Sequence, residues 1–213
     1  MKRLCVFGAN GQTGVEVLKQ CLQQQVPVRA AVRDAQSVAE YADQVDVVEY
    51  SFDDPASVVS ALKDCDVAMS VIGSGGQAQA AKETTLYSRS IRTLINALRK
   101  TNKDRLLVIS SAGVEYDSQA PWYYRYFFRP FLMNSYMDMM KVETVLEETD
   151  EALRWTIVRP TYLLDGKAKP YRVNNRKMGG GNFKIHRIDV ADFMVKESQR
   201  DEWVRQYPVL GYP

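Results

Sequence analysis

Glycines recur at every third position over residues 8–14, in the spacing GxxGxxG, between an apolar run at residues 4–7 and a helix-like segment at residues 15–18. Gly8 can take a tight turn, Gly11 lets the backbone approach phosphate oxygens, and Gly14 lets a helix pack closely on a strand. Amide groups at the helix N-terminus then bind the anion. Glycine-rich turns also occur with no ligand, but these flanks favour the pyrophosphate of a dinucleotide.

The second candidate is Arg33, at the end of a strand expected at residues 26–32. An acidic residue at this point accepts hydrogen bonds from the ribose hydroxyls of NAD, whereas the guanidinium fork of arginine binds the 2′-phosphate of NADP. Arg33 therefore favours NADPH. The adjacent Asp34 keeps NAD as an alternative cofactor. The other alternative is that Arg33 is simply a solvated arginine at a strand end.

Further candidates stand where expected strands end, because ligands lie at the carboxyl edge of doubly wound sheets. Phe52 follows a strand at residues 46–50, where it either flanks an adenine or packs in the core. Gly73 ends a near-continuous apolar strand at residues 66–73, the pattern of a parallel strand covered on both faces. Both positions therefore belong to the candidate ligand edge.

Two hydroxyls, Ser110 and Ser111, end the strand expected at residues 106–111. One interpretation is that a serine reaches the nicotinamide or a substrate carbonyl. The other is that the serines bond to local backbone, as they often do at strand ends. The sequence favours neither.

Residues 121–132 have an unusual composition, with seven aromatic side chains and two interleaved arginines among twelve residues. They could form a wall or lid over the nicotinamide that stacks on a planar acceptor, with Trp122, Tyr123 and Phe127 as substrate contacts. Aromatic and arginine enrichment is equally expected of an oligomer interface. Plain packing in the core is the third possibility, and the three stay open.

The composition restricts the partners and the compartment. With 28 basic and 26 acidic residues the net charge is +2, so there is no bulk electrostatic case for binding nucleic acid or membranes. Three widely spaced cysteines and a single histidine offer no metal-ligand pattern, and the cysteines are typical of core thiols in a reducing compartment. No run approaches the roughly 18 apolar residues of a membrane span. We expect a cytoplasmic protein without metal, monomeric or weakly homo-oligomeric.

The expected elements alternate between strands and helices along the chain. Asp54 and Pro55 mark one helix start, and Asp189 is expected to cap the last helix. This succession predicts one α/β domain over residues 1–213, a doubly wound parallel sheet with helices on both faces and an aromatic-rich insertion at residues 114–137. The other expected segments are helices at residues 56–62, 77–102, 139–149 and 189–198, a strand at residues 153–159 and a polar loop at residues 174–181.

Four stretches, residues 8–14, 32–34, 155–160 and 187–193, together resemble the atypical short-chain dehydrogenases/reductases. Within them the chain is similar to the NAD(P)H-binding, NmrA-like group that contains flavin reductase, also called biliverdin-IXβ reductase. The similarity runs from Lys2 to about Ser198. It implies a Rossmann fold and a cofactor more specifically than a substrate, because the group also contains members with no assigned reaction.

The resemblance implies roles for individual residues. In such proteins the glycine turn binds the pyrophosphate, and the arginine after the second strand holds the 2′-phosphate. Strand ends line the path to the nicotinamide, and the segment after the sixth strand passes near the carboxamide. The corresponding residues here are Gly8, Asn10, Gly11, Gln12, Thr13 and Gly14; Arg33; Val71, Ile72, Gly73, Ser110 and Ser111; and Pro160, Thr161, Tyr162 and Leu163.

The departures from the family pattern concern the catalytic machinery. Carbonyl-reducing short-chain dehydrogenases use Tyr-x-x-x-Lys, in which the lysine lowers the tyrosine pKa. Lys141 lies five positions after Tyr136 rather than four, so the two side chains would be about 140° apart around a helix. In the flavin-reductase group no such dyad is expected. Ser51 also stands where the group often has aspartate, and the lone His186 is expected at a polar surface or cap position.

These features predict an NADPH-dependent reductase that transfers a hydride to a planar conjugated acceptor, such as a flavin, a quinone or a biliverdin-like tetrapyrrole. Ser111 is the candidate catalytic residue, orienting the acceptor or the nicotinamide. The alternative is a non-catalytic NADP(H)-sensing protein of NmrA-like type. In that case the missing dyad means lost catalysis, and the aromatic segment binds a protein partner.

Overall fold

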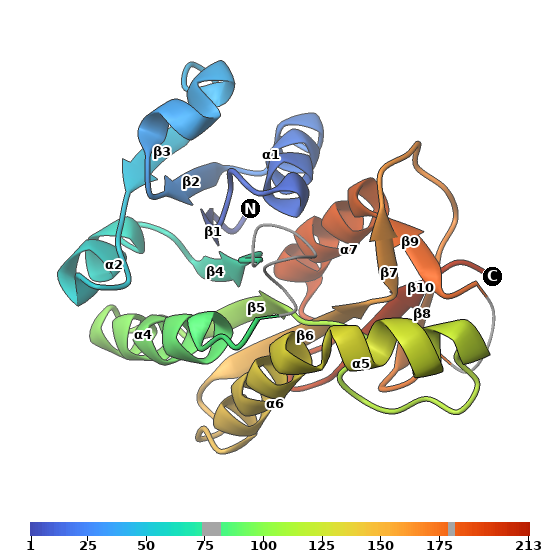
Figure 1. Cartoon of the computed structure of the whole chain (residues 1–213). Coiled ribbons are helices and arrows are strands. Elements are labelled where there is room, and N and C mark those ends of the chain that lie inside the picture. The colour runs from blue at the N-terminus through green and yellow to red at the C-terminus, as the bar shows by residue number, and fades with distance from the viewer. Residues whose placement is uncertain (74–81, 179–181) are drawn as a thin grey trace.

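The computed structural model describes residues 1–73, 82–178 and 182–213. An eight-stranded sheet in the order β3-β2-β1-β4-β5-β6-β10-β8 forms its centre (Figure 1). All neighbours in it pair parallel except β10 and β8, which are antiparallel. Beside it, β7 (Tyr162–Leu164) and β9 (Lys184–His186) form a parallel pair. The sheet strands are β1 (Leu4–Phe7), β2 (Val28–Val32), β3 (Asp46–Glu49), β4 (Val67–Ser70), β5 (Arg105–Ile109), β6 (Arg154–Pro160), β8 (Arg172–Asn175) and β10 (Pro208–Gly211).

The sheet is buried on both faces, because successive strand residues point to opposite sides. Leu4 and Val6 belong to a core shared with α1 and α7, whereas Cys5 and Phe7 belong to one shared with α2, α4 and α6. Figure 1 shows these two groups of helices on opposite sides of the sheet. The expected doubly wound α/β domain is therefore confirmed. The helices are α1 (Gln12–Gln23), α2 (Pro55–Ala61), α4 (Leu86–Lys100), α5 (Arg129–Phe131), α6 (Met133–Glu147) and α7 (Arg187–Arg200), with the 3-10 helix η1 (Ala35–Tyr41) and the π-helix η2 (Tyr124–Phe128).

The strand order reverses at β1, which lies between β2 and β4. Helix α1, which follows β1, packs on one face of the sheet, and α4, the next described helix after β4, packs on the other. In doubly wound sheets a ligand crevice opens at this reversal, outside the carboxyl ends of the strands. The topology thus places the candidate site beside the glycine turn.

The long helix expected at residues 77–102 is shorter than the pattern suggested. Residues 77–81 lie outside the described part of the chain, residues 82–85 are not helical, and α4 begins at Leu86. A carboxylate from another helix marks that start, because Asp138 of α6 accepts hydrogen bonds from the amides of Tyr87 and Ser88 at 2.9 and 3.2 Å. The cap comes from 50 residues away along the chain, so helical periodicity could not locate it.

The polar loop expected at residues 174–181 is wrong at its beginning. Asn174 and Asn175 end strand β8, which pairs antiparallel with β10 at the edge of the sheet. An edge strand has one side open to solvent and tolerates polar residues. Its composition therefore looked like that of a loop.

The cap expected at Asp189 is also wrong. Helix α7 begins at Arg187, with His186 at the cap position. The buried carboxylate of Asp189 accepts hydrogen bonds from the Lys169 amide at 3.1 Å and from the Tyr212 hydroxyl at 2.5 Å. It ties the C-terminal strand to the first turn of α7.

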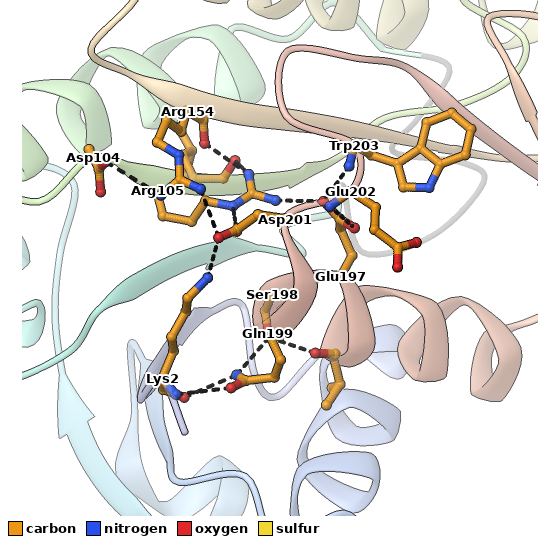
Figure 2. A network of polar contacts seen from close by, with 12 residues as sticks. Lys2, Asp104, Arg105, Arg154, Glu197, Ser198, Gln199, Asp201, Glu202 and Trp203 are labelled. Atoms are coloured by element: carbon orange, nitrogen blue, oxygen red, sulfur yellow. Dashed lines mark hydrogen bonds and ion pairs between the residues drawn. The ribbon is translucent and has the colours of Figure 1, made fainter.

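Ion pairs join the amino ends of β5 and β6 to the end of α7 (Figure 2). Arg105 is buried, and its guanidinium donates to Glu197 Oε1 at 2.8 Å and to Asp201 Oδ1 at 2.7 Å. Arg154 donates to the other oxygen of Asp201 at 2.7 Å, and Lys2 also pairs with this carboxylate. Because this edge is opposite the strand ends that face the crevice, the network stabilises the fold away from the candidate site.

Replacing Asp201 with asparagine is expected to lower the free energy of unfolding. Burial opposes ionisation of this carboxylate, but hydrogen bonds from Lys2, Arg105 and Arg154 outweigh it and lower the pKa of Asp201 to about 2. A lowered carboxyl pKa stabilises the fold above the unfolded pKa of 3.8, and the stabilisation is lost as pH falls through about 2. We expect Asp201→Asn to cost about 2 kcal/mol in urea unfolding at pH 7, and progressively less below about pH 4.

Asp53→Asn is the matched control for this measurement. Asp53 pairs with Arg89 at the surface, where an ion pair contributes about 0–1 kcal/mol. Equal losses in the two variants would contradict the assigned role of Asp201. So would an Asp201→Asn loss that stays the same at about pH 2.5.

Candidate functional site

The glycine turn has the geometry that its spacing predicted. Gly8 has a φ of +84°, a conformation that L side chains rarely adopt, and a Cβ there would lie 3.1 Å from the Ile72 Cα. The Gly11 amide donates to the Gly8 carbonyl at 3.0 Å and closes the turn. A Cβ on Gly14 would lie only 2.2 Å from the Gly8 carbonyl oxygen. Side chains at Gly8 and Gly14 are thus excluded by backbone.

The start of α1 can accept an anion. Gly11 occupies the cap position, no side chain caps the helix, and its first turn holds no acidic residue. The first amides of a helix have no partner within it and carry partial positive charge. Asn10 and Gln12 are exposed at this end, while Thr13 is buried. The site therefore offers free amides and room for phosphate oxygens.

A groove of about 670 Å³ lies at the strand reversal. This volume is in the range of small-molecule and cofactor sites. It brings together the expected residues Gly8, Asn10, Gly11, Arg33, Phe52, Val71, Ile72 and Gly73. Its lining also holds residues that the sequence did not indicate, namely Val32, Tyr50, Ser51, Asp53, Glu83, Thr84, Thr85, Leu86, Arg89 and Ser90. Gln12, Thr13 and Gly14 lie in the first turn of α1 and do not line the groove.

Arg33 and Asp34 differ in what their side chains do. The Arg33 side chain is exposed, lines the groove and makes no ion pair with the described residues. Asp34 instead caps η1, accepting a hydrogen bond from the Gln36 amide at 2.9 Å. Burial raises the pKa of Tyr50, which lines the same groove, to about 12, against the opposing charge of Arg33. The groove thus presents a free cation rather than a carboxylate at the end of β2.

Phe52 packs against the core and also lines the groove. Its ring packs on Tyr50 and Phe7, with centroids 5.0 and 6.3 Å away, so it belongs to the core. It is only half-buried and also lines the groove, where a flat base could lie against it. Asp53 and Arg89 form an ion pair in the lining of the same groove.

The two serines at the end of β5 have separate environments. Ser110 is buried and donates to Glu143 Oε1 at 3.0 Å, and Arg159 binds both oxygens of that carboxylate, at 3.0 and 2.6 Å. Ser111 is half-buried, and its hydroxyl is a hydrogen-bond partner of Tyr136. Ser110 therefore helps hold β5 to α6 and β6, whereas the Ser111 hydroxyl also accepts a hydrogen bond from the Gly113 amide at 3.2 Å, as the local-backbone interpretation predicted. Neither lines the 670 Å³ groove.

Tyr136 and Tyr124 are the site neighbours that sequence spacing did not reveal. Their hydroxyls lie 2.8 Å apart next to Gly113, where a Cβ would lie 2.0 Å from the Tyr124 oxygen. Burial raises the pKa of Tyr136, against the lowering effect of hydrogen bonds with Tyr124 and Ser111, so the phenol stays protonated at neutral pH. Lys141 is exposed, whereas Tyr136 is buried. The position of Tyr136 on the helix after β5 could have indicated this site. The absence of a lysine at the required spacing argued against it.

The segment 160–163 runs from β6 into the small β7–β9 pair. Thr161 is buried and bonds the Leu210 carbonyl through both its amide and its hydroxyl, at 2.9 Å each. Leu163 is paired with Ile185, and Tyr162 is partly exposed against Phe128. Like Pro160, these residues do not line the groove.

The aromatic segment lies largely at the surface. Trp122, Tyr123 and Phe127 are 63, 50 and 66% exposed, and among the described residues that line the groove none comes from this segment. Core packing is therefore wrong for these three side chains, although Tyr124 is buried against Phe183.

His186 takes the cap position of α7, and its Nδ1 lies 2.7 Å from the Lys167 carbonyl oxygen.

Two kinds of feature are absent from the described residues. No group of three or more His, Cys, Asp or Glu side chains is arranged to hold a metal ion. None of the helices described is both long enough and apolar enough to cross a membrane.

Comparison with known proteins identifies the family. The model of the NAD(P)H-binding family matches residues 8–201. This chain belongs to that family. Uncharacterized protein YwnB of Bacillus subtilis (strain 168) is 25% identical over 205 residues, which cover 91% of this chain and 89% of YwnB.

Solved structures of this NAD(P)H-binding protein's neighbours share its fold. A short-chain dehydrogenase/reductase from Veillonella parvula in complex with NADP aligns with a TM-score of 0.79 at 19% identity, over 100% of this chain and 95% of that one. ChuY, an anaerobilin reductase from Escherichia coli O157:H7, aligns with a TM-score of 0.75 at 23% identity, over 99% and 97% of the two chains. At these identities the likeness shows the fold alone.

Substituting Gly14 with alanine is expected to weaken NADPH binding. The Cβ would displace the Gly8 carbonyl and with it the amides that face the phosphates. Because a hydrogen bond to a charged group contributes about 1.5–3 kcal/mol, we expect a loss of at least about tenfold in affinity by titration calorimetry.

Ser60→Ala on α2 is the control, since Ser60 is exposed and does not line the groove. Circular dichroism of both variants checks the fold. If the two variants bind NADPH equally well while Gly14→Ala is folded, the turn is not the pyrophosphate site.

Proposed function

We propose that this NAD(P)H-binding protein is an NADPH-dependent reductase that passes a hydride to a planar conjugated acceptor, such as a flavin, a quinone or a linear tetrapyrrole. The observation that carries the proposal is the groove that joins the glycine turn to the unpaired Arg33. The buried and unpaired cysteines, Cys5, Cys21 and Cys65, support a reducing, cytoplasmic setting.

The residues that line the groove support binding of the adenosine and pyrophosphate part of NADPH. The amides at the start of α1 would bind the pyrophosphate, Arg33 the 2′-phosphate, and Phe52 one face of the adenine. Val71 and Ile72 would line the path toward the end of β5. When bound, the cofactor supplies the hydride, and the protein supplies position and electrostatics.

Preference for NADPH over NADH follows from charge. The free guanidinium of Arg33 suits a dianionic phosphate. Asp34, the acid that could bind a ribose diol, instead accepts a hydrogen bond at the start of η1. The NADP complex of the Veillonella parvula relative supports the same cofactor here.

The hydroxyls of Ser111 and Tyr136 would orient the acceptor. Both phenols of the Tyr124–Tyr136 pair stay protonated because burial raises their pKa, so this cluster donates hydrogen bonds but offers no readily formed phenolate. A conjugated ring that takes a hydride can receive its proton from solvent and does not need a tyrosine–lysine acid. That the neighbour ChuY is an anaerobilin reductase supports this acceptor class.

The direct test measures NADPH oxidation with flavin mononucleotide, dichlorophenolindophenol and biliverdin as acceptors. We expect turnover with at least one of them, and an Arg33→Glu variant with a KM for NADPH raised by about 100-fold or more, because a charge pair is replaced by repulsion. The KM for NADH should change far less.

Arg92→Glu is the matched control, because Arg92 is an exposed arginine on α4 that does not line the groove. If no acceptor is reduced faster than by the Arg33→Glu variant, the reductase proposal fails. Tight NADPH and NADP⁺ binding together with that silence would favour the NADP(H)-sensing alternative.

The serine assignment makes a separate prediction. Ser111→Ala is expected to lower kcat about tenfold at an unchanged affinity for NADPH, because one orienting hydrogen bond is lost. Ser110→Ala tests the neighbouring position, whose hydroxyl bonds Glu143, and should reduce stability more than kcat.

Because burial raises the pKa of Tyr136, kcat should stay flat from about pH 6 to 9. Loss of activity above pH 7 would show that a group with an ordinary pKa controls the step.

A further inference from the structure

Exposed aromatic side chains gather on one segment of the surface. In Figure 1 this segment is the yellow-green helical stretch that leads into α6. Its exposed apolar or aromatic residues, which we call the aromatic patch, are Trp122, Tyr123, Tyr126, Phe127, Phe128 and Phe131. Apolar patches of this kind on a soluble domain mark interaction surfaces.

The charge of the patch has one sign. Residues 119–137 include Arg125 and Arg129 but no aspartate or glutamate. Neither arginine has an ion-pair partner among the described residues. The Arg129 Nε donates to the Gly113 carbonyl at 3.2 Å, and Arg125 donates to the Tyr116 hydroxyl at 3.2 Å. Both charges therefore remain uncompensated beside the exposed rings.

A second copy of the chain fits this surface poorly. A two-fold dimer would place the same patch on both sides of the interface, and residues 119–137 of neither copy would supply a carboxylate for the arginines of the other. An anionic partner removes that conflict. Trp, Tyr and Phe beside Arg form the composition that inserts at the boundary between lipid headgroups and acyl chains.

We propose that the aromatic patch docks the protein on an anionic lipid surface. Trp122 and Phe127, at 63 and 66% exposed, insert into the interface, and Arg125 and Arg129 face the lipid phosphates. The protein lies on the membrane without crossing it. This inference does not depend on the proposed reductase function, because it involves neither the groove nor a cofactor.

The test is sedimentation of the full chain with phosphatidylcholine vesicles that contain about 30% phosphatidylglycerol, against pure phosphatidylcholine. We expect binding to the anionic vesicles with a blue shift of tryptophan emission. Trp122→Phe should abolish the shift but keep the binding, since Trp155 is buried and Trp203 is partly buried away from the patch. Trp122→Ser/Phe127→Ser should weaken binding at least about tenfold.

The charge arm uses matched double variants. Arg125→Glu/Arg129→Glu should weaken binding to anionic vesicles about 25-fold or more, because each arginine contributes about fivefold. Lys63→Glu/Lys100→Glu should bind as the wild type does. It makes the same change in net charge at two exposed positions, just after α2 and at the end of α4. Circular dichroism confirms that each variant is folded.

Three outcomes would overturn the proposal. One is that no vesicle binds the wild-type chain. Another is that the serine double variant binds as well as the wild type. The third is a concentration-dependent dimer that the serine double variant abolishes while vesicles stay unbound, which would assign the patch to a second copy. None of them would alter NADPH turnover, so failure here is distinguishable from failure of the reductase proposal.

Discussion

The contact between the Gly14 Cα and the Gly8 carbonyl is the constraint on which the site depends. It lets α1 begin directly above the end of β1, at the point where the strand order reverses. Because the helix starts so close, its N-terminus lies beside the groove that Gly8, Asn10 and Gly11 line. A Cβ at Gly14 would move the helix away from the turn, and the same strand order would then surround a crevice without an anion site.

The residue types along the chain were sufficient to predict the parallel part of the sheet. Strands such as β1 and β4 are buried on both faces and are therefore continuously apolar, and the residue types at turns give their ends. The errors arose where a partner far along the chain decides the outcome. β8 is polar because it is an edge strand held by β10, and α4 starts where Asp138 of another helix caps it. Asp189, an acid at a plausible cap position, is used by Tyr212 instead.

The candidate site shows the same division. The glycine turn and Arg33 follow from single residues at strand ends, and the groove contains both. Which of the two adjacent serines binds a buried carboxylate could not be predicted, because the answer depends on Glu143 and Arg159, more than 30 residues away. Tyr136 was set aside because its lysine is missing, yet a hydroxyl can still orient an acceptor when it cannot act as an activated acid.

The two edges of the sheet carry different kinds of charge. At the amino edge, the cations of Lys2, Arg105 and Arg154 converge on the Asp201 carboxylate and are paired within the fold. At the groove and the aromatic patch, Arg33, Arg125 and Arg129 lack an acidic partner in the part of the chain that the structure describes. With a net charge of only +2, the molecule as a whole does not attract anions, so attraction must come from such local imbalances. The unpaired arginines at two separate surfaces therefore argue for anionic ligands more strongly than the small net charge argues against them.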